Sequence, residues 1–222
     1  MAVNRMQHQL QQIYDLTPTA NVRDFLITSN HDLKNIEADN TIRPSDEKLL
    51  IQQQGDDLYV SLYIAEELLD KLEHHDPFER LDENNLPEFC VVLEGVSHFV
   101  YLCWNANYNR SVTQLDLELQ AEVDKFVSIY TLSNLQGNPV CLSELDNWLF
   151  NRCHFSPDLG ILEFNRYQKA NDSARRFCRK ISPLIGRNND RQSPCRELKR
   201  FYRRRNHDKL DSVRSLVAIP GP

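Results

Sequence analysis

Residues 89–104, FCVVLEGVSHFVYLCW, form the longest apolar stretch of the chain. Apolar side chains cover nearly the whole helical circumference here, which is typical of a helix in the centre of a protein core. The stretch is interrupted by polar residues that include Glu94 and His98, and it is shorter than the roughly 18–20 apolar residues that a membrane span requires. We therefore predict a buried helix over about 87–106 and no membrane contact.

Glu94 and His98 are four residues apart, so they share one face of this apolar helix. Unpaired ionisable groups are costly in such a place, and these two require partners, a cavity or a changed protonation state. Glu118 and Glu122, also four apart, belong to the next predicted helix. The loop between the two helices is short, which favours antiparallel packing with the two pairs facing each other. Arg166 is expected to neutralise one of the nearby glutamates.

Three interpretations of this polar group stay open, and a satisfied structural network that sets the register of the helices is the favoured one. The second is a metal site, because facing helices supply carboxylate and imidazole ligands in di-iron proteins. Those sites use Glu-x-x-His in two copies, whereas this chain has a single Glu-x-x-x-His at Glu94 and His98. The third is acid-base chemistry by Glu94 and His98 in a pocket.

Two strand-like runs in residues 47–64, EKLLIQQQGDDLYVSLYI, flank a turn at Gly55. The second run alternates, so that its apolar residues share one face, which predicts a β-hairpin over about 48–64 with one face buried. The β-branched and aromatic residues of 22–28 predict a further strand. We therefore expect a small antiparallel β element within about 22–64.

Helical spacing dominates residues 65–181, where about five helices are expected. Ser111 is the predicted N-cap of the third, and Ser143 with Asp146 resembles a capping box at the start of the fourth. The predicted fold is thus α+β and predominantly α-helical, with the small β element packed on a helical body. The five helices are expected at about 65–75, 87–106, 111–132, from 143, and 158–181.

The net charge of -6 is the sum of two opposite contributions. Residues 1–174 contain 12 Lys and Arg against 28 Asp and Glu, whereas residues 175–222 contain 14 against 4. We therefore predict a single acidic body over 1–181 and a basic C-terminal arm over 182–222. The arm includes a predicted helix at 196–206.

The arm alternates basic and aromatic side chains, which suit phosphate contacts and base stacking. An acidic body would repel a nucleic acid, however, and no nucleic-acid-binding signature is present. Docking of the arm on the acidic body, on a second copy or on a protein partner, and a solvated tail, are the alternatives. The candidate partner-binding residues are Arg196, Lys199, Arg200, Phe201, Tyr202, Arg203, Arg204 and Arg205.

No glycine loop for phosphates, nucleophile elbow, HExxH, kinase motif or calcium loop occurs in the chain, which has only 6 glycines. The function expected from the sequence is therefore that of a non-catalytic interaction or regulatory protein with no predicted cofactor, binding a protein partner or another copy. One alternative is a helical metal-binding or acid-base enzyme centred on Glu94, His98, Glu118 and Glu122, and a third is nucleic-acid contact by the basic arm. The N-terminal residues lack the apolar core of a signal peptide, which favours a cytoplasmic location.

Overall fold

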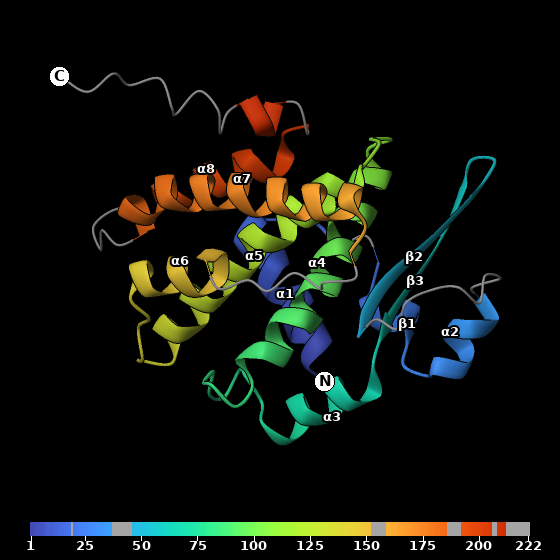
Figure 1. Cartoon of the computed structure of the whole chain (residues 1–222), viewed down its shortest axis with the longest axis horizontal. Helices are drawn as coiled ribbons and strands as arrows, with labels where there is room; N and C mark the ends of the chain where they lie inside the picture. The colour runs from blue at the N-terminus through green and yellow to red at the C-terminus, as the bar shows by residue number, and fades with distance from the viewer. Residues whose placement is uncertain (19, 37–45, 152–158, 186–191, 206–207, 212–222) are drawn as a thin grey trace.

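The computed structural model describes residues 1–18, 20–36, 46–151, 159–185, 192–205 and 208–211. This part of the chain is mainly helical with one small sheet, so the prediction of a predominantly helical α+β fold is confirmed (Figure 1). The elements in chain order are α1 (Ala2–Tyr14), the 3-10 helix η1 (Val22–Phe25), β1 (Leu26–Ile27), α2 (Asn30–Ile36), β2 (Glu47–Gln54), β3 (Asp57–Ile64), α3 (Glu66–His74), α4 (Leu86–Asn107), α5 (Gln114–Leu135), α6 (Leu142–Asn151), α7 (Ile161–Ile185) and α8 (Gln192–Arg203).

The sheet has the strand order β1-β3-β2 and is mixed. Strands β2 and β3 form the predicted hairpin, antiparallel, with Glu47 opposite Ile64. Strand β1 pairs parallel to β3, so the expectation of a purely antiparallel element is wrong. Most of the strand predicted over 22–28 is instead the helix η1, which begins after Asn21, whose side chain accepts a hydrogen bond from the Arg23 amide.

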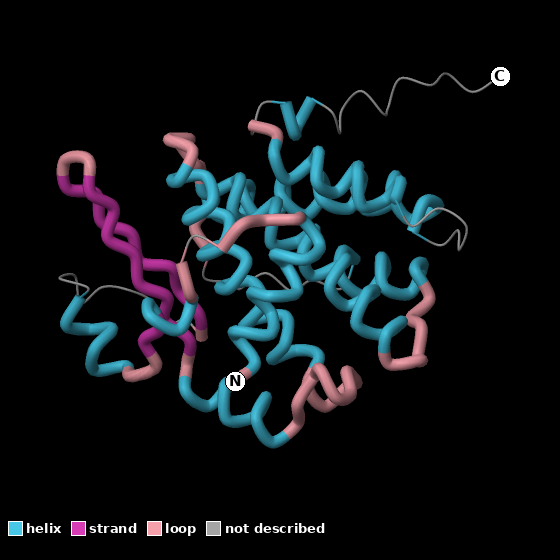
Figure 2. Tube along the Cα trace, turned by 180° about the vertical axis from the view of Figure 1, so that it is seen from behind, coloured by secondary structure: helices cyan, strands magenta, loops and turns pink. Residues whose placement is uncertain are grey.

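The hairpin is buried only at the end next to the helices. Leu62 and Ile64 are buried, whereas Ile51 and Leu58 are exposed, and the tip projects away from the helices (Figure 2). Gly55 supplies the positive φ of 64° that the turn requires. The alternation predicted one buried face along the whole of β3, but the helices do not extend far enough to cover the outer half of the hairpin.

Helix α4 lies at the centre of the fold and packs against α1, α3, α5 and the sheet. Its length and composition would suit a membrane span, but 67% of the most apolar window is buried by the rest of the protein. The apolar circumference of 89–104 is therefore used for packing within the fold, as predicted for a central helix.

Two predicted helix caps are wrong. Helix α5 is capped by Thr113 and not by Ser111, because Thr113 and Asp116 form a reciprocal capping box. Asp146 does not cap α6; its carboxylate binds the guanidinium groups of Arg175 and Arg179 at 3.0 and 2.9 Å. Ion pairing with α7 thus takes precedence over local capping at this residue.

Helices α7 and α8 join the body and the arm. Helix α7 continues past the boundary expected at 181 and ends at Ile185, and α8 packs on α1 and α7. The Phe201 ring of α8 lies 3.8 Å from the Phe177 ring of α7, measured between centroids. The described part of the arm therefore contributes to the same hydrophobic core as the body. The predicted helix 196–206 begins earlier, at residue 192, and Asn206 lies outside the described residues.

Candidate functional site

Glu94 and His98 lie on the face of α4 that meets Glu118 of α5. A carboxylate oxygen of each glutamate and a ring nitrogen of His98 all lie within 4.8 Å of one another. His98 Nε2 is 3.8 Å from Glu118 Oε2, and the His98 side chain is only 8% exposed. The structure thus brings three of the four predicted residues together, and we call them the Glu94–His98–Glu118 cluster.

The fourth predicted residue, Glu122, joins this cluster through Lys125. Lys125 Nζ donates to Glu94 Oε2 at 2.5 Å and to Glu122 Oε1 at 2.8 Å. Burial lowers the pKa of Lys125, but Glu122 and Glu94 outweigh burial and raise it well above its ordinary value. Lys125 is therefore a fixed positive charge at the edge of the cluster.

Glu47 of β2 also faces the cluster, although no sequence pattern connects it with the other residues. Its carboxylate comes close to α4 because residue 95 is glycine: a Cβ on Gly95 would lie 2.8 Å from Glu47 Oε2. Burial, and then Glu94 and Glu118, raise the pKa of Glu47 well above its usual range. Only the long-range packing of the strand on the helix places this carboxylate, so local spacing could not reveal it.

Arg166 of α7 approaches the cluster from another side. Its Nε lies 3.8 Å from Glu118 Oε1, and its Nη1 donates to Gln114 Oε1 at 2.7 Å. The expected contact of Arg166 with a glutamate of α5 is therefore present. Among the described residues, Arg166 and Lys125 are the cations that the ion-pair distances place beside the cluster.

Carboxyl groups outnumber cations at this site, with four glutamates facing Lys125 and Arg166. The pKa of Glu118 rises to about 8, first because of burial and then because of Glu94. The pKa of Glu122 is also raised, mainly by burial. Burial would likewise raise the pKa of Glu94, but Lys125 and His98 outweigh it and hold that pKa below its ordinary value. The site at neutral pH therefore keeps Glu94 ionised and Glu118 protonated.

His98 is neutral at this site because burial lowers its pKa to about 4, against the opposing effect of Glu94. Its Nε2 has no hydrogen-bond partner among the described residues. A buried polar atom without a partner is uncommon in folded proteins and requires an explanation. A neutral imidazole nitrogen beside carboxylate oxygens is the ligand set of many first-row transition-metal sites.

The nearby hydroxyl of Ser97 does not offer a nucleophile to His98. Ser97 Oγ donates to Asp124 Oδ2 at 2.6 Å, on a different face of α4. Asp124 also accepts hydrogen bonds from Tyr14 and Gln120, at 2.5 and 2.8 Å. Ser97 and His98 are adjacent in sequence but do not form a catalytic pair. Ser97 belongs to a second buried network.

This second network extends to Lys209, which the sequence did not single out. Lys209 Nζ donates to Gln120 Oε1 at 2.8 Å and to the Tyr101 hydroxyl at 2.9 Å, and it lies 4.2 Å from the Tyr101 ring centroid. Burial lowers the pKa of Lys209 to about 7, against Asp116 and Asp124. Aromatic rings surround the amine, so Lys209 anchors the C-terminal region to the core.

The aromatic residues of the arm are not on the surface. Phe201 and Tyr202 are each 1% exposed, so the expectation that they contact a partner is incompatible with this conformation. Lys199 and Arg203 contact Asp15 of the body, through its carboxylate and its carbonyl oxygen. The described part of the arm thus folds onto the acidic body, which was one of the alternatives. Among the candidate partner-binding residues, the basic side chains that remain exposed are Arg196, Arg200, Arg203 and Arg205.

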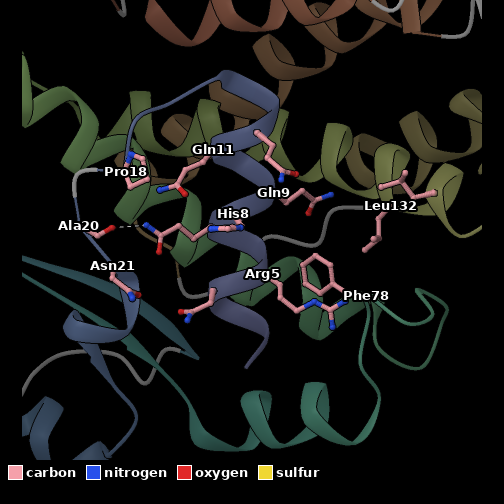
Figure 3. A pocket seen from close by; sticks show the side chains of 13 residues that line it. Arg5, His8, Gln9, Gln11, Pro18, Ala20, Asn21, Phe78 and Leu132 are labelled. Atoms are coloured by element: carbon pink, nitrogen blue, oxygen red, sulfur yellow. Dashed lines mark hydrogen bonds between the residues drawn. The ribbon is translucent and has the colours of Figure 1, made fainter.

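A pocket of about 780 Å³ lies along α1, away from the Glu94–His98–Glu118 cluster, and contains none of the predicted site residues (Figure 3). Its lining is mainly neutral amides and apolar side chains. The Arg5 guanidinium at one end lies 4.4 Å from the Phe78 ring centroid and is paired with Asp76. The pocket offers space for a neutral ligand, but its only acid-base or metal-ligating side chain among the lining residues is His8, with no carboxylate beside it in the lining.

Comparisons of the chain with protein-family models, with curated proteins and with solved structures give no match, so its function has to be argued from the chemistry of these sites.

Proposed function

We propose that the protein binds a divalent transition-metal ion between α4 and α5, with Glu94, His98 and Glu118 as ligands. The observation that carries this proposal is the neutral, buried His98, whose Nε2 has no hydrogen-bond partner among the described residues and faces carboxylates. A divalent cation that displaces protons from these buried carboxyl groups would compensate the negative charge left on them. Imidazole together with carboxylate favours Mn²⁺, Fe²⁺ or Zn²⁺ over Ca²⁺.

The spacing of the ligand atoms is compatible with one ion. Ligand atoms held at about 2.1 Å from a metal lie about 3–3.4 Å from one another. The three donor groups lie within 4.8 Å of one another, so modest rotations of the two glutamate side chains suffice. Lys125 binds one oxygen of Glu94. The other oxygen of that carboxylate is available to a metal ion, and a small movement of Lys125 would free the first.

Proton release should accompany metal binding. Glu118 has a pKa of about 8 and therefore holds a proton at pH 7, which a metal ion must displace. Metal affinity should consequently increase with pH up to about 8. Calorimetric titration in two buffers of different ionisation enthalpy measures the number of protons released.

The test of the proposal is metal content and metal affinity of protein purified without an affinity tag. We expect one ion per chain by elemental analysis, or tight binding of added Mn²⁺ or Zn²⁺ after treatment with a chelator. The variants His98→Ala and Glu118→Gln should lose at least tenfold in affinity. Glu118→Gln is nearly isosteric, so it tests the ligand without opening a cavity.

Two exposed residues of α3 provide matched controls, His74→Ala and Glu67→Gln, which should leave the affinity unchanged. Absence of stoichiometric binding in the wild type, with a cooperative melt showing that it is folded, would refute the metal site. The buried cluster would then be interpreted as a structural network or an acid-base pair, as the sequence also allowed.

A second candidate function is contact with an acidic protein surface, which includes the acidic body of another copy. The exposed side chains of Arg196 and Arg200 on α8 favour it, because they lie on the side of that helix away from the core. Sedimentation of the wild type and of Arg196→Glu with Arg200→Glu, at low and high salt, tests self-association. A salt-independent monomer in both would exclude the second-copy form of this function.

A further inference from the structure

A second pocket, separate from the Glu94–His98–Glu118 cluster, lies where the end of α4, the start of α5 and the residues after α8 meet. Its volume is about 260 Å³. Its lining combines three arginines with one carboxylate: Arg110, Arg204, Arg205 and Asp116. Such a combination is suited to an anionic ligand that also carries a hydrogen-bond donor.

Arg110 is held at this pocket without help from a carboxylate. Asn109 has a φ of 51° and ends α4 in a tight turn. The Arg110 guanidinium lies 5.2 Å from the Trp104 ring centroid, and its Nη1 donates to the carbonyl oxygen of Arg203 at 3.1 Å. The guanidinium is therefore oriented in advance, with further N–H groups available to a ligand.

Among the described residues, no carboxylate lies within ion-pair distance of Arg110, Arg204 or Arg205. The three arginines come from two distant segments, which converge because the C-terminal end of α8 contacts the residues between α4 and α5. Arginine can form two parallel N–H···O hydrogen bonds to a phosphate, so this lining favours a phosphate over an anion that consists of a single atom.

Asp116, which lines the same pocket, has one carboxylate oxygen without a hydrogen-bond partner among the described residues. Its Oδ2 accepts from the amide and hydroxyl of Thr113, at 2.9 and 2.6 Å. Its Oδ1 has no hydrogen-bond partner among the described residues, although the residue is only 3% exposed. A buried carboxylate oxygen of this kind is stabilised by a donor, which a bound hydroxyl or amino group would supply.

We propose that this pocket binds a small phosphate monoester that also carries a hydroxyl or amino group. The three guanidinium groups outnumber the Asp116 carboxylate, so the lining has an excess of positive charge, which suits the charge of about −1.5 to −2 on a phosphate monoester at pH 7. The N-terminus of α5 adds a favourable dipole. The volume of about 260 Å³ corresponds to a sugar phosphate and not to a polymer in a groove.

Calorimetric titration of the full chain with ribose 5-phosphate, inorganic phosphate and ribose tests the proposal. Ribose 5-phosphate should bind more tightly than inorganic phosphate, and ribose alone should not bind. Arg204→Ala and Arg205→Ala should each weaken binding at least tenfold. Arg200→Ala is the matched control, because Arg200 is an exposed arginine of the same segment that does not line the pocket.

Asp116→Asn separates recognition of the phosphate from recognition of the donor. The substitution removes a negative charge and places a donor in the pocket, so inorganic phosphate should bind more tightly and the preference for ribose 5-phosphate should disappear. Failure of ribose 5-phosphate to bind the folded wild type overturns the proposal. Equal weakening by Arg200→Ala and Arg205→Ala, together with equal binding of a single-stranded DNA oligonucleotide, also overturns it and indicates a general basic surface.

Discussion

Glu118 carries a proton at neutral pH because it is buried beside Glu94 and only partly compensated by Arg166 and Lys125. This is a property of the folded state alone. An unfolded chain would release that proton near the ordinary pKa of glutamate. The protonation of Glu118 is therefore coupled both to folding and to any metal ion that displaces the proton.

The variant Glu118→Gln should show this coupling in the metal-free protein. Between pH 4.5 and about 8 the folded wild type holds a proton that the unfolded chain releases, so wild-type stability falls as the pH rises through this range. The glutamine does not titrate. The free energy of unfolding of Glu118→Gln relative to the wild type should thus increase by at least about 1 kcal/mol between pH 5 and pH 8.

Urea denaturation of both proteins at several pH values, with a chelator present, measures this difference. His98, Glu94 and Glu47 also face Glu118, and their own contributions are largely common to the two proteins. A difference that stays constant from pH 5 to pH 8 would contradict the raised pKa of Glu118.

Individual residues of the site differ in how well the sequence predicted them. The four-residue spacings placed Glu94 with His98 and Glu118 with Glu122, because helical periodicity is local. Glu47 was not predicted, since it reaches the cluster through strand packing and the absence of a side chain at Gly95. Burial of Phe201 was also missed, because basic neighbours make a strongly charged helix resemble a free surface.

At the level of secondary-structure elements, the contact of α4 with the β2–β3 hairpin positions a carboxylate for the cluster. The spacing patterns predicted both elements, but not their contact. A Cβ on Gly95 would lie 2.8 Å from Glu47 Oε2 and 3.0 Å from Leu62 Cδ1. Both are flexible side-chain ends, so the close approach constrains where the Glu47 carboxylate sits more than it constrains the backbone.

Gly95→Ala should therefore change the cluster more than the stability. Alanine favours a helix over glycine by about 1 kcal/mol, which offsets the strain of moving two side chains. We expect the free energy of unfolding to stay within about 1 kcal/mol of the wild type. Metal affinity should fall severalfold, because the Glu47 carboxylate is displaced from the other carboxylates.

Denaturation and metal titration of the same sample measure the two effects. Gly160→Ala is the matched control, since its Cβ would meet Glu163 Oε2 at an ordinary 3.6 Å, away from the cluster. Unchanged metal affinity in Gly95→Ala would show that Glu47 makes no contribution to the site. A loss of several kcal/mol would show instead that the strand and helix backbones cannot adjust.

At the scale of the whole molecule, the opposite charges of the two segments meet inside one fold. Arg175 and Arg179 bind Asp146, and Lys199 binds Asp15. The Lys199–Asp15 pair is exposed and contributes little energy, whereas Asp146 is buried between its two arginines. The larger contribution comes from apolar side chains of α8, since Leu198, Phe201 and Tyr202 belong to the core. The charge asymmetry that suggested a separable arm therefore coincides with an integral helix.

A chain that ends at residue 185 should consequently fail to fold stably. Loss of each large buried side chain costs about 2–5 kcal/mol, and three such losses approach the whole stability of a typical domain, about 5–15 kcal/mol. The same truncation removes Lys209 from Gln120 and exposes Phe177. Thermal unfolding followed by circular dichroism should show a melting temperature far below that of the wild type, or no cooperative transition.

A chain that ends at residue 211 is the control, because it retains α8 and Lys209 with their contacts to the core, and it should melt as the full chain does. If the chain ending at 185 melted like the wild type, α8 would be a detachable docking element, and partner binding by its buried face would regain support. Collapse of the shorter chain alone would mean that only the exposed arginines of α8 are free to meet a partner. Packing of the apolar face of α8 in the core would then exclude that face from partner binding.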